Sequence, residues 1–133
     1  MESASFNSQK IYRKSLALQD LSEAIAAYFS SNRDALSIKR YGSFRDDISK
    51  CLVTDANLIT KQIHLASSSS SHNTRMKSLA FINVMTQNIL AYCNGLEKDG
   101  VKEKEYLNLL RKEIRSFRVS FKKWRKSFQS GTD

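Results

Sequence analysis

The chain has 133 residues, no proline and only four glycines, which argues against an all-β domain because such folds need many tight turns. Its length suits one domain with a single core. The formal net charge of +9 favours a polyanionic partner such as nucleic acid, an anionic membrane or an acidic protein; a basic surface that only keeps the chain in solution is the alternative.

The first predicted helix covers residues 8–30, with Ser8 as its N-cap. Its inner face consists of Ile11, Leu18, Leu21, Ile25 and Tyr28. A connector follows over residues 32–42, and Ala35, Leu36 and Ile38 suggest a short extra turn within it.

The second predicted helix covers residues 43–66. Asp46 and Asp47 fall in its first turn, where acidic side chains suit the helix dipole. The expected inner residues are Phe44, Ile48, Cys51, Leu52, Ile59 and Ile63. Asp55 lies in the middle of this helix, and we interpret it as a partly buried structural acid that is capped or paired. Residues 67–73, which are mostly serine, predict a flexible surface loop.

The third predicted helix, residues 74–94, is apolar around most of its circumference. Phe81, Met85 and Tyr92 fall on one side and Leu79 and Leu90 on another. A helix that is apolar all round must be covered on more than one side, so we expect another subunit to cover part of it. Asn94-Gly95 is the expected C-cap, and a turn containing Asp99-Gly100 follows.

The fourth predicted helix, residues 102–128, is the most informative segment. Its apolar residues follow a 3-4 spacing that marks one buried face: Leu107, Leu110, Ile114, Phe117, Phe121, Trp124 and Phe128. Eight cations lie on one flank and the back: Arg111, Lys112, Arg115, Arg118, Lys122, Lys123, Arg125 and Lys126. The opposite flank carries small or apolar side chains, so another helix could approach it closely: Leu109, Ser116, Ser120 and Ser127. Residues 102–133 hold ten cations and four acids, a net of +6.

These elements predict an all-α fold, an antiparallel up-down-up-down four-helix bundle in a single domain over residues 1–133. The cations between the aromatic residues also resemble a base-stacking platform for single-stranded nucleic acid. We interpret Phe117 and Phe121 as core residues, and leave open whether Trp124 and Phe128 are core or contact residues.

Catalytic chemistry finds no support in the sequence. A metal site is not expected, because His64 and His72 have no aligned third ligand. A phosphate-binding site is not expected either, because no Gly-rich loop follows a strand. The run of serines is typical of a linker and not of a catalytic nucleophile. Cys51 and Cys93 form no C-x-x-C pair and are typical of buried thiols in a reduced protein. The N-terminus does not resemble a signal peptide, and the longest apolar run, residues 89–93, is far shorter than the ~20 residues of a membrane span. We therefore expect a cytoplasmic protein without catalytic activity, cofactor, metal, membrane span or small-molecule substrate.

Taken as a whole, the chain resembles a known family. The features are the aromatic pair Tyr28-Phe29, a basic connector, the segment 48–52 (ISKCL), an apolar third helix ending at Gly95-Leu96, and the segment 117–124 (FRVSFKKW). Together they resemble the accessory variability determinant of diversity-generating retroelements. A more distant likeness is to the four-helix-bundle proteins encoded in ribosomal RNA intervening sequences. That second group usually has Ile-Pro-x-Asn-Ile-Ala-Glu-Gly in helix 2, whereas residues 53–60 here read VTDANLIT, which favours the retroelement group.

The resemblance implies a barrel-shaped homopentamer that binds a reverse transcriptase and its template RNA or cDNA, in support of mutagenic retrohoming. Contacts from cations to phosphates predict binding that tolerates any sequence. The eight cations of the fourth helix are then the candidate nucleic-acid and partner contacts. The candidate oligomer interface is Leu79, Phe81, Met85, Leu90, Tyr92, Leu109 and Ser116. Two alternatives remain: a protein-interaction or scaffold protein of a phage or mobile element with no direct nucleic-acid role, and a protein that uses the basic helix at a membrane surface.

Overall fold

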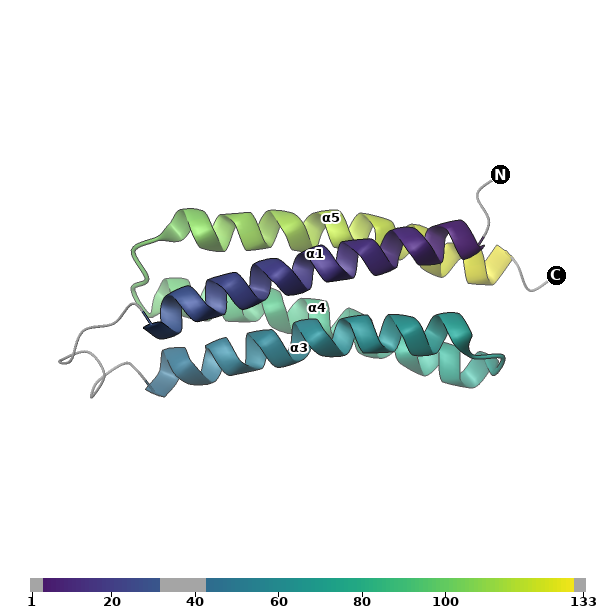
Figure 1. Cartoon of the computed structure of the whole chain (residues 1–133), viewed down its shortest axis with the longest axis horizontal. Helices are drawn as coiled ribbons and strands as arrows, with labels where there is room; N and C mark the ends of the chain where they lie inside the picture. The colour runs from purple at the N-terminus through teal and green to yellow at the C-terminus, as the bar shows by residue number, and fades with distance from the viewer. Residues whose placement is uncertain (1–3, 32–42, 131–133) are drawn as a thin grey trace.

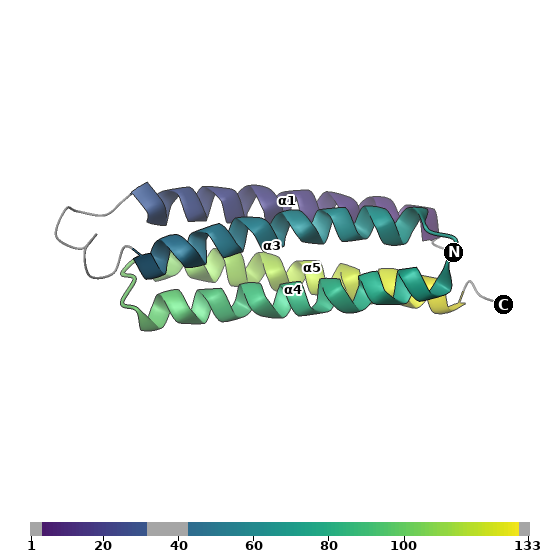
Figure 2. The same cartoon turned by 90° about the horizontal axis from the view of Figure 1, so that it is seen from below.

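The protein is a bundle of four long helices, seen here in a computed structural model that describes residues 4–31 and 43–130 (Figure 1). The helices are α1 (Ala4–Ser31), α3 (Ser43–Ser68), α4 (His72–Lys98) and α5 (Lys104–Ser130). Each runs antiparallel to the one before it, and α5 returns beside α1 to close the ring (Figure 2). The described residues contain no strand. The connector at 32–42, with the short turn expected there, lies outside the described residues.

The four predicted helices are present, but some of their ends differ from the prediction. α1 begins at Ala4, so Ser8 is not its N-cap. The Ser8 side chain instead accepts a hydrogen bond from Nε1 of Trp124 at 2.9 Å. α4 continues to Lys98 and is capped by Asp99, so the predicted C-cap at Asn94-Gly95 is also wrong.

Gly95 lies inside α4 because α3 approaches closely there. A Cβ atom at this position would lie 3.3 Å from Cδ1 of Ile48 and 3.8 Å from the ring of Phe44. The glycine that ends the helix is Gly100, whose φ of 88° is left-handed and favours glycine. The turn predicted at Asp99-Gly100 is therefore where the chain reverses toward α5.

The serine-rich segment is a short, hydrogen-bonded turn rather than a seven-residue loop. α3 continues to Ser68 and α4 begins at His72, which leaves three residues between them. Ser71 is the N-cap of α4 and accepts a hydrogen bond from the Thr74 amide at 3.3 Å. The guanidinium of Arg75 donates to the carbonyl of Ser69 at 2.7 Å. These serines serve mainly to end one helix and start the next.

The α5 stripe supplies much of the core, as its spacing predicts. All seven predicted inner residues are at most 9% exposed: Leu107, Leu110, Ile114, Phe117, Phe121, Trp124 and Phe128. Trp124 is fully buried, and the ring of Phe128 lies 4.4 Å beneath the guanidinium of Arg75. Trp124 and Phe128 are therefore core residues, and the aromatic stripe is not a base-stacking platform.

No helix in the described part of the chain is both long and apolar enough to cross a membrane.

Two predicted inner residues of α3 are exposed. Phe44 is 46% exposed and Cys51 also lies at the surface. Leu52 is buried, and Cys51 precedes it by one residue, a rotation of ~100° around the helix. Phe44 is one heptad before Cys51, so both residues lie at the edge of the buried face.

Cys93 is buried as predicted, and burial raises the pKa of its thiol to about 11.

Asp55 is a structural acid that joins α3 to α4. It is 8% exposed, and its Oδ2 accepts a hydrogen bond from the Tyr92 hydroxyl at 2.6 Å. Two causes raise the pKa of Tyr92 above its usual value: partial burial is the larger, and the neighbouring Asp55 carboxyl group is the second. The phenol thus stays protonated and keeps donating to the carboxylate.

We predict that Tyr92→Phe lowers the free energy of unfolding by about 1–2 kcal/mol, because it leaves the buried Asp55 carboxylate without this donor. Urea denaturation followed by circular dichroism measures the change. Tyr12→Phe removes a hydroxyl from a 42% exposed ring on α1 and is the control, expected to change stability by less than about 0.5 kcal/mol. Equal effects from the two substitutions would contradict a structural role for the Tyr92–Asp55 bond.

Candidate nucleic-acid interface

Burial of the apolar stripe fixes which way the other sides of α5 face. Arg111 marks the side toward α4, because its guanidinium pairs with Glu97 at 2.6 Å. Ser116 marks the side toward α1, because its hydroxyl accepts a hydrogen bond from Nζ of Lys14 at 2.7 Å. The arc between these two sides faces away from the bundle, and the predicted cations lie along its length.

Five of the eight cations form a row on the α4 side of this arc. Their 4-3-4-3 spacing places them on one side of the helix: Arg111, Arg115, Arg118, Lys122 and Arg125. Arg115 and Lys122 are exposed, whereas Arg118 and Arg125 are half-buried. We call these five residues the basic row. The other three, Lys112, Lys123 and Lys126, are exposed farther around the helix, so all eight belong to one broad basic surface.

Arg111 differs from the rest because it holds two helices together. Besides its ion pair with Glu97, it donates to the side-chain oxygens of Asn94 at 2.8 Å and Asn108 at 3.0 Å. Its side chain is only 17% exposed. Glu97 neutralises much of its charge, so Arg111 is a structural residue first and the weakest phosphate ligand of the eight.

Arg125 also uses part of its side chain for packing, since its guanidinium lies 5.6 Å from the centre of the Phe121 ring. By contrast, Lys112, Arg115, Lys122 and Lys123 are exposed and form no ion pair with any described residue. These four residues have their charge available to an external anion. They are the centre of the candidate interface.

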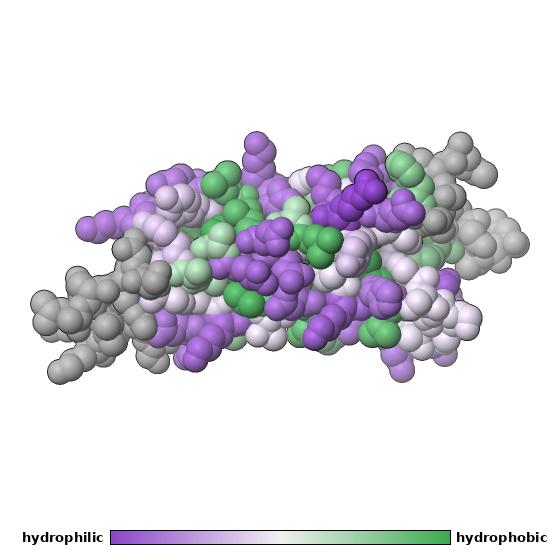
Figure 3. Space-filling view, in the orientation of Figure 1, coloured by the Kyte–Doolittle hydropathy of each residue, from purple (hydrophilic) through white to green (hydrophobic). Residues whose placement is uncertain are grey.

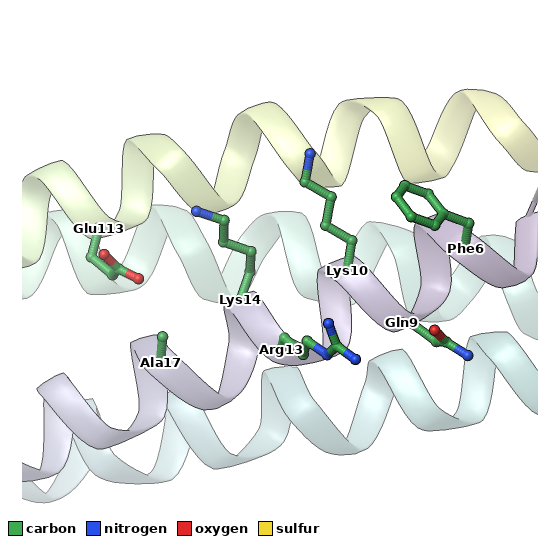
Figure 4. A pocket seen from close by; sticks show the side chains of 7 residues that line it. All are labelled: Phe6, Gln9, Lys10, Arg13, Lys14, Ala17 and Glu113. Atoms are coloured by element: carbon green, nitrogen blue, oxygen red, sulfur yellow. The ribbon is translucent and has the colours of Figure 1, made fainter. Parts of the chain in front are cut away.

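Sequence reasoning missed a second group of cations on α1. Lys10, Arg13 and Lys14 line a groove between α1 and α5 together with Phe6, Gln9, Ala17 and Glu113 (Figure 4). Its volume is about 390 Å³. The signal in the sequence was the cluster of three cations in residues 10–14, which draws attention only once α1 is known to pack against α5.

The candidate oligomer interface needs correction. Leu79 and Met85 are 3% and 7% exposed within the single chain, so they need no second subunit to cover them. Tyr92 is bonded to Asp55 of α3, and Ser116 faces α1 through Lys14. α4 is apolar on two sides because it packs against both α3 and α5.

The surface that remains for another subunit is the outer face of α4. Phe81 is 41% and Val84 49% exposed, and the 19 residues from 78 to 96 contain no charge. Leu90 of α4 is half-buried. Leu109 is 52% exposed but lies one heptad before Ser116, on the side of α5 toward α1 and not toward α4. On the face shown in Figure 3, by contrast, hydrophobic side chains alternate with hydrophilic ones.

No protein-family model, curated protein or solved structure matches this chain. The family resemblance in the sequence therefore stays a prediction.

We predict different effects from neutralising two arginines of the basic row. Arg111→Gln should lower the free energy of unfolding by about 1 kcal/mol, since it breaks a partly buried ion pair and strains the α4–α5 contact. Arg115→Gln, its control on the exposed side, should change stability by less than about 0.5 kcal/mol. Thermal and urea denaturation measure both. A larger loss from Arg115→Gln would contradict the structural role of Arg111.

Proposed function

We propose that this protein is a noncatalytic accessory factor that binds nucleic acid through the basic surface of α5. The supporting observation is that four cations, Lys112, Arg115, Lys122 and Lys123, are exposed on one helix without an ion pair among the described residues. Neutralising phosphates with such cations releases condensed counterions from RNA or DNA. Binding of this kind tolerates any sequence and weakens as salt increases.

The resemblance to retroelement accessory proteins makes the proposal more specific. On that basis the protein binds the reverse transcriptase of a diversity-generating retroelement together with its template RNA or cDNA, and supports mutagenic retrohoming in the cytoplasm. A reverse-transcriptase gene beside the gene for this chain, with paired template and variable repeats, would support the assignment. Without such a neighbour, a scaffold or protein-interaction role becomes the better proposal, and the uncharged outer face of α4 favours that role.

The electrostatic part of the proposal predicts a steep salt dependence. Binding of labelled RNA and DNA should weaken by orders of magnitude between ~50 and ~200 mM salt. The double variant Arg115→Gln/Lys122→Gln removes two contacts, and should reduce the slope of log affinity against log salt by about 1.4–1.8. Fluorescence anisotropy measures both quantities.

The control for this experiment is Lys50→Gln/Lys61→Gln, which removes the same charge from exposed positions on α3. It should leave the slope nearly unchanged if contacts concentrate on α5. Binding that does not respond to salt, or an equal loss in both double variants, would overturn the proposed interface.

We also propose that the chain forms a homo-oligomer, a pentamer by the resemblance, through the outer face of α4. Light scattering after size exclusion should then give about five times the 15.2 kDa chain mass. Val84→Glu should dissociate the assembly, because a charge buried between subunits is costly. Leu65→Glu, at a 48% exposed position on α3, is the control. A wild-type monomer of about 15 kDa would refute the oligomer, and dissociation by Leu65→Glu alone would place the interface elsewhere.

A further inference from the structure

One arginine of the basic row, Arg118, is half-buried on the α4 side of α5 and yet has no partner. It forms no ion pair, hydrogen bond or ring contact with any described residue. We propose that Arg118 and the side-chain amide of Gln87 together bind one phosphate group of the nucleic acid at the seam between α5 and α4. This inference rests on the proposed function and deepens it, because it assigns a phosphate to a defined pair of side chains.

Two contacts fix how α4 and α5 are aligned along the seam. Near the start of α5, the guanidinium of Arg111 donates to Asn94 at 2.8 Å. Near its end, the ring of Phe128 lies beneath the guanidinium of Arg75. The two helices are antiparallel (Figure 2), so two turns forward along α5 correspond to two turns back along α4.

This alignment places Gln87 opposite Arg118. Arg118 is seven residues after Arg111 on α5, and Gln87 is seven residues before Asn94 on α4. Seven residues are close to two full turns of a helix, so both residues stay on the sides that face the seam. Gln87 is exposed, and α4 and α5 approach each other less closely than the other neighbouring helices do. The seam is therefore open to a group that arrives from solvent.

Arg118 differs from Arg111 because no acid stands opposite it. Glu97 pairs with Arg111 at 2.6 Å. The residue one heptad before Glu97 is Leu90, and no residue from 78 to 96 is charged. The part of α4 that faces Arg118 thus cannot neutralise it. The five N–H donors of this guanidinium are left to water or to an external anion.

The chemistry of the two side chains suits a phosphate. A guanidinium donates two parallel N–H bonds to two oxygens of one phosphate group. The Gln87 amide adds an N–H donor from the other side of the seam and brings no charge that would repel the phosphate. Arg115 and Lys122 lie about one turn before and after Arg118, where they meet further phosphates of the same strand. Such contacts fix the position of a strand without selecting its sequence.

The most direct test adds the missing acid. Gln87→Glu is nearly isosteric and places a carboxylate opposite Arg118, as Glu97 stands opposite Arg111. For a labelled single-stranded RNA, this substitution should lower the slope of log affinity against log salt by about 0.7, because one phosphate contact is lost. Arg118→Gln should lower the slope by the same amount. Fluorescence anisotropy between ~50 and ~200 mM salt measures both.

Double variants separate pairing with Arg118 from a general repulsion of RNA. In an Arg118→Gln background, Gln87→Glu should change the slope little further, whereas in an Arg115→Gln background it should still lower the slope by about 0.7. Asn88→Asp is the matched control. It adds the same charge one residue along α4, ~100° around the helix and away from Arg118, and should leave the slope nearly unchanged. Circular dichroism checks that each variant is folded.

Arg118→Lys tests the two parallel bonds, because it keeps the charge and removes the fork. The slope should stay the same, and the affinity should fall about fivefold, which is what one net hydrogen bond is worth. Arg115→Lys changes an exposed arginine in the same way and should affect the affinity little.

The outcomes separate this inference from the proposed function. If wild-type binding depends on salt as proposed, but Gln87→Glu lowers the slope equally with and without Arg118, the phosphate site at the seam is overturned and the basic surface of α5 stands. If the wild type does not bind RNA, both are overturned. Equal losses of affinity from Arg118→Lys and Arg115→Lys would overturn the bidentate contact at Arg118.

Discussion

Burial of the α5 stripe is the constraint on which the rest of the molecule depends. Seven apolar side chains with 3-4 spacing must all enter the core, and only one rotation of the helix about its axis achieves this. A shift by one residue would turn the helix by ~100° and bring cations of the basic row toward the interior. The cost of burying unpaired charge excludes that arrangement. The position of the basic surface is thus a consequence of core packing.

The fold followed from the sequence wherever one strong periodic signal was present. The seven inner residues of α5 were all assigned correctly, and so were Ile11, Leu18 and Ile25 of α1. Errors occurred where a residue type has two physical uses. Ser8 resembles an N-cap but binds Trp124, and Gly95 resembles a helix end but allows close packing of α3. Pairwise contacts between distant segments decide such cases, and one sequence does not reveal them.

The candidate site was predictable in part for the same reason. The eight cations of α5 share a helix, so their spacing alone placed them on its outer side. Neither the pairing of Arg111 with Glu97 nor the groove lined by Lys10 and Lys14 could be foreseen, since each joins two helices. The sequence shows the apolar excess of α4 but not which part of it α3 and α5 cover. Only the outer part, with Phe81 and Val84, is left for the proposed second subunit.

The hydrogen bond from Trp124 to Ser8 has a consequence for synthesis of the chain. It joins residues 116 positions apart, and the whole α1–α5 contact likewise unites the first helix with the last. On the ribosome, α1 emerges before α5 and stays uncovered on one side until α5 has been synthesised. During that interval Ile11 and Leu18, which are fully buried in the finished bundle, have only α3 and α4 to contact. A nascent chain that does not yet include Trp124 lacks this contact and leaves the core open to water or chaperones. The bundle therefore closes only once α5 has been synthesised.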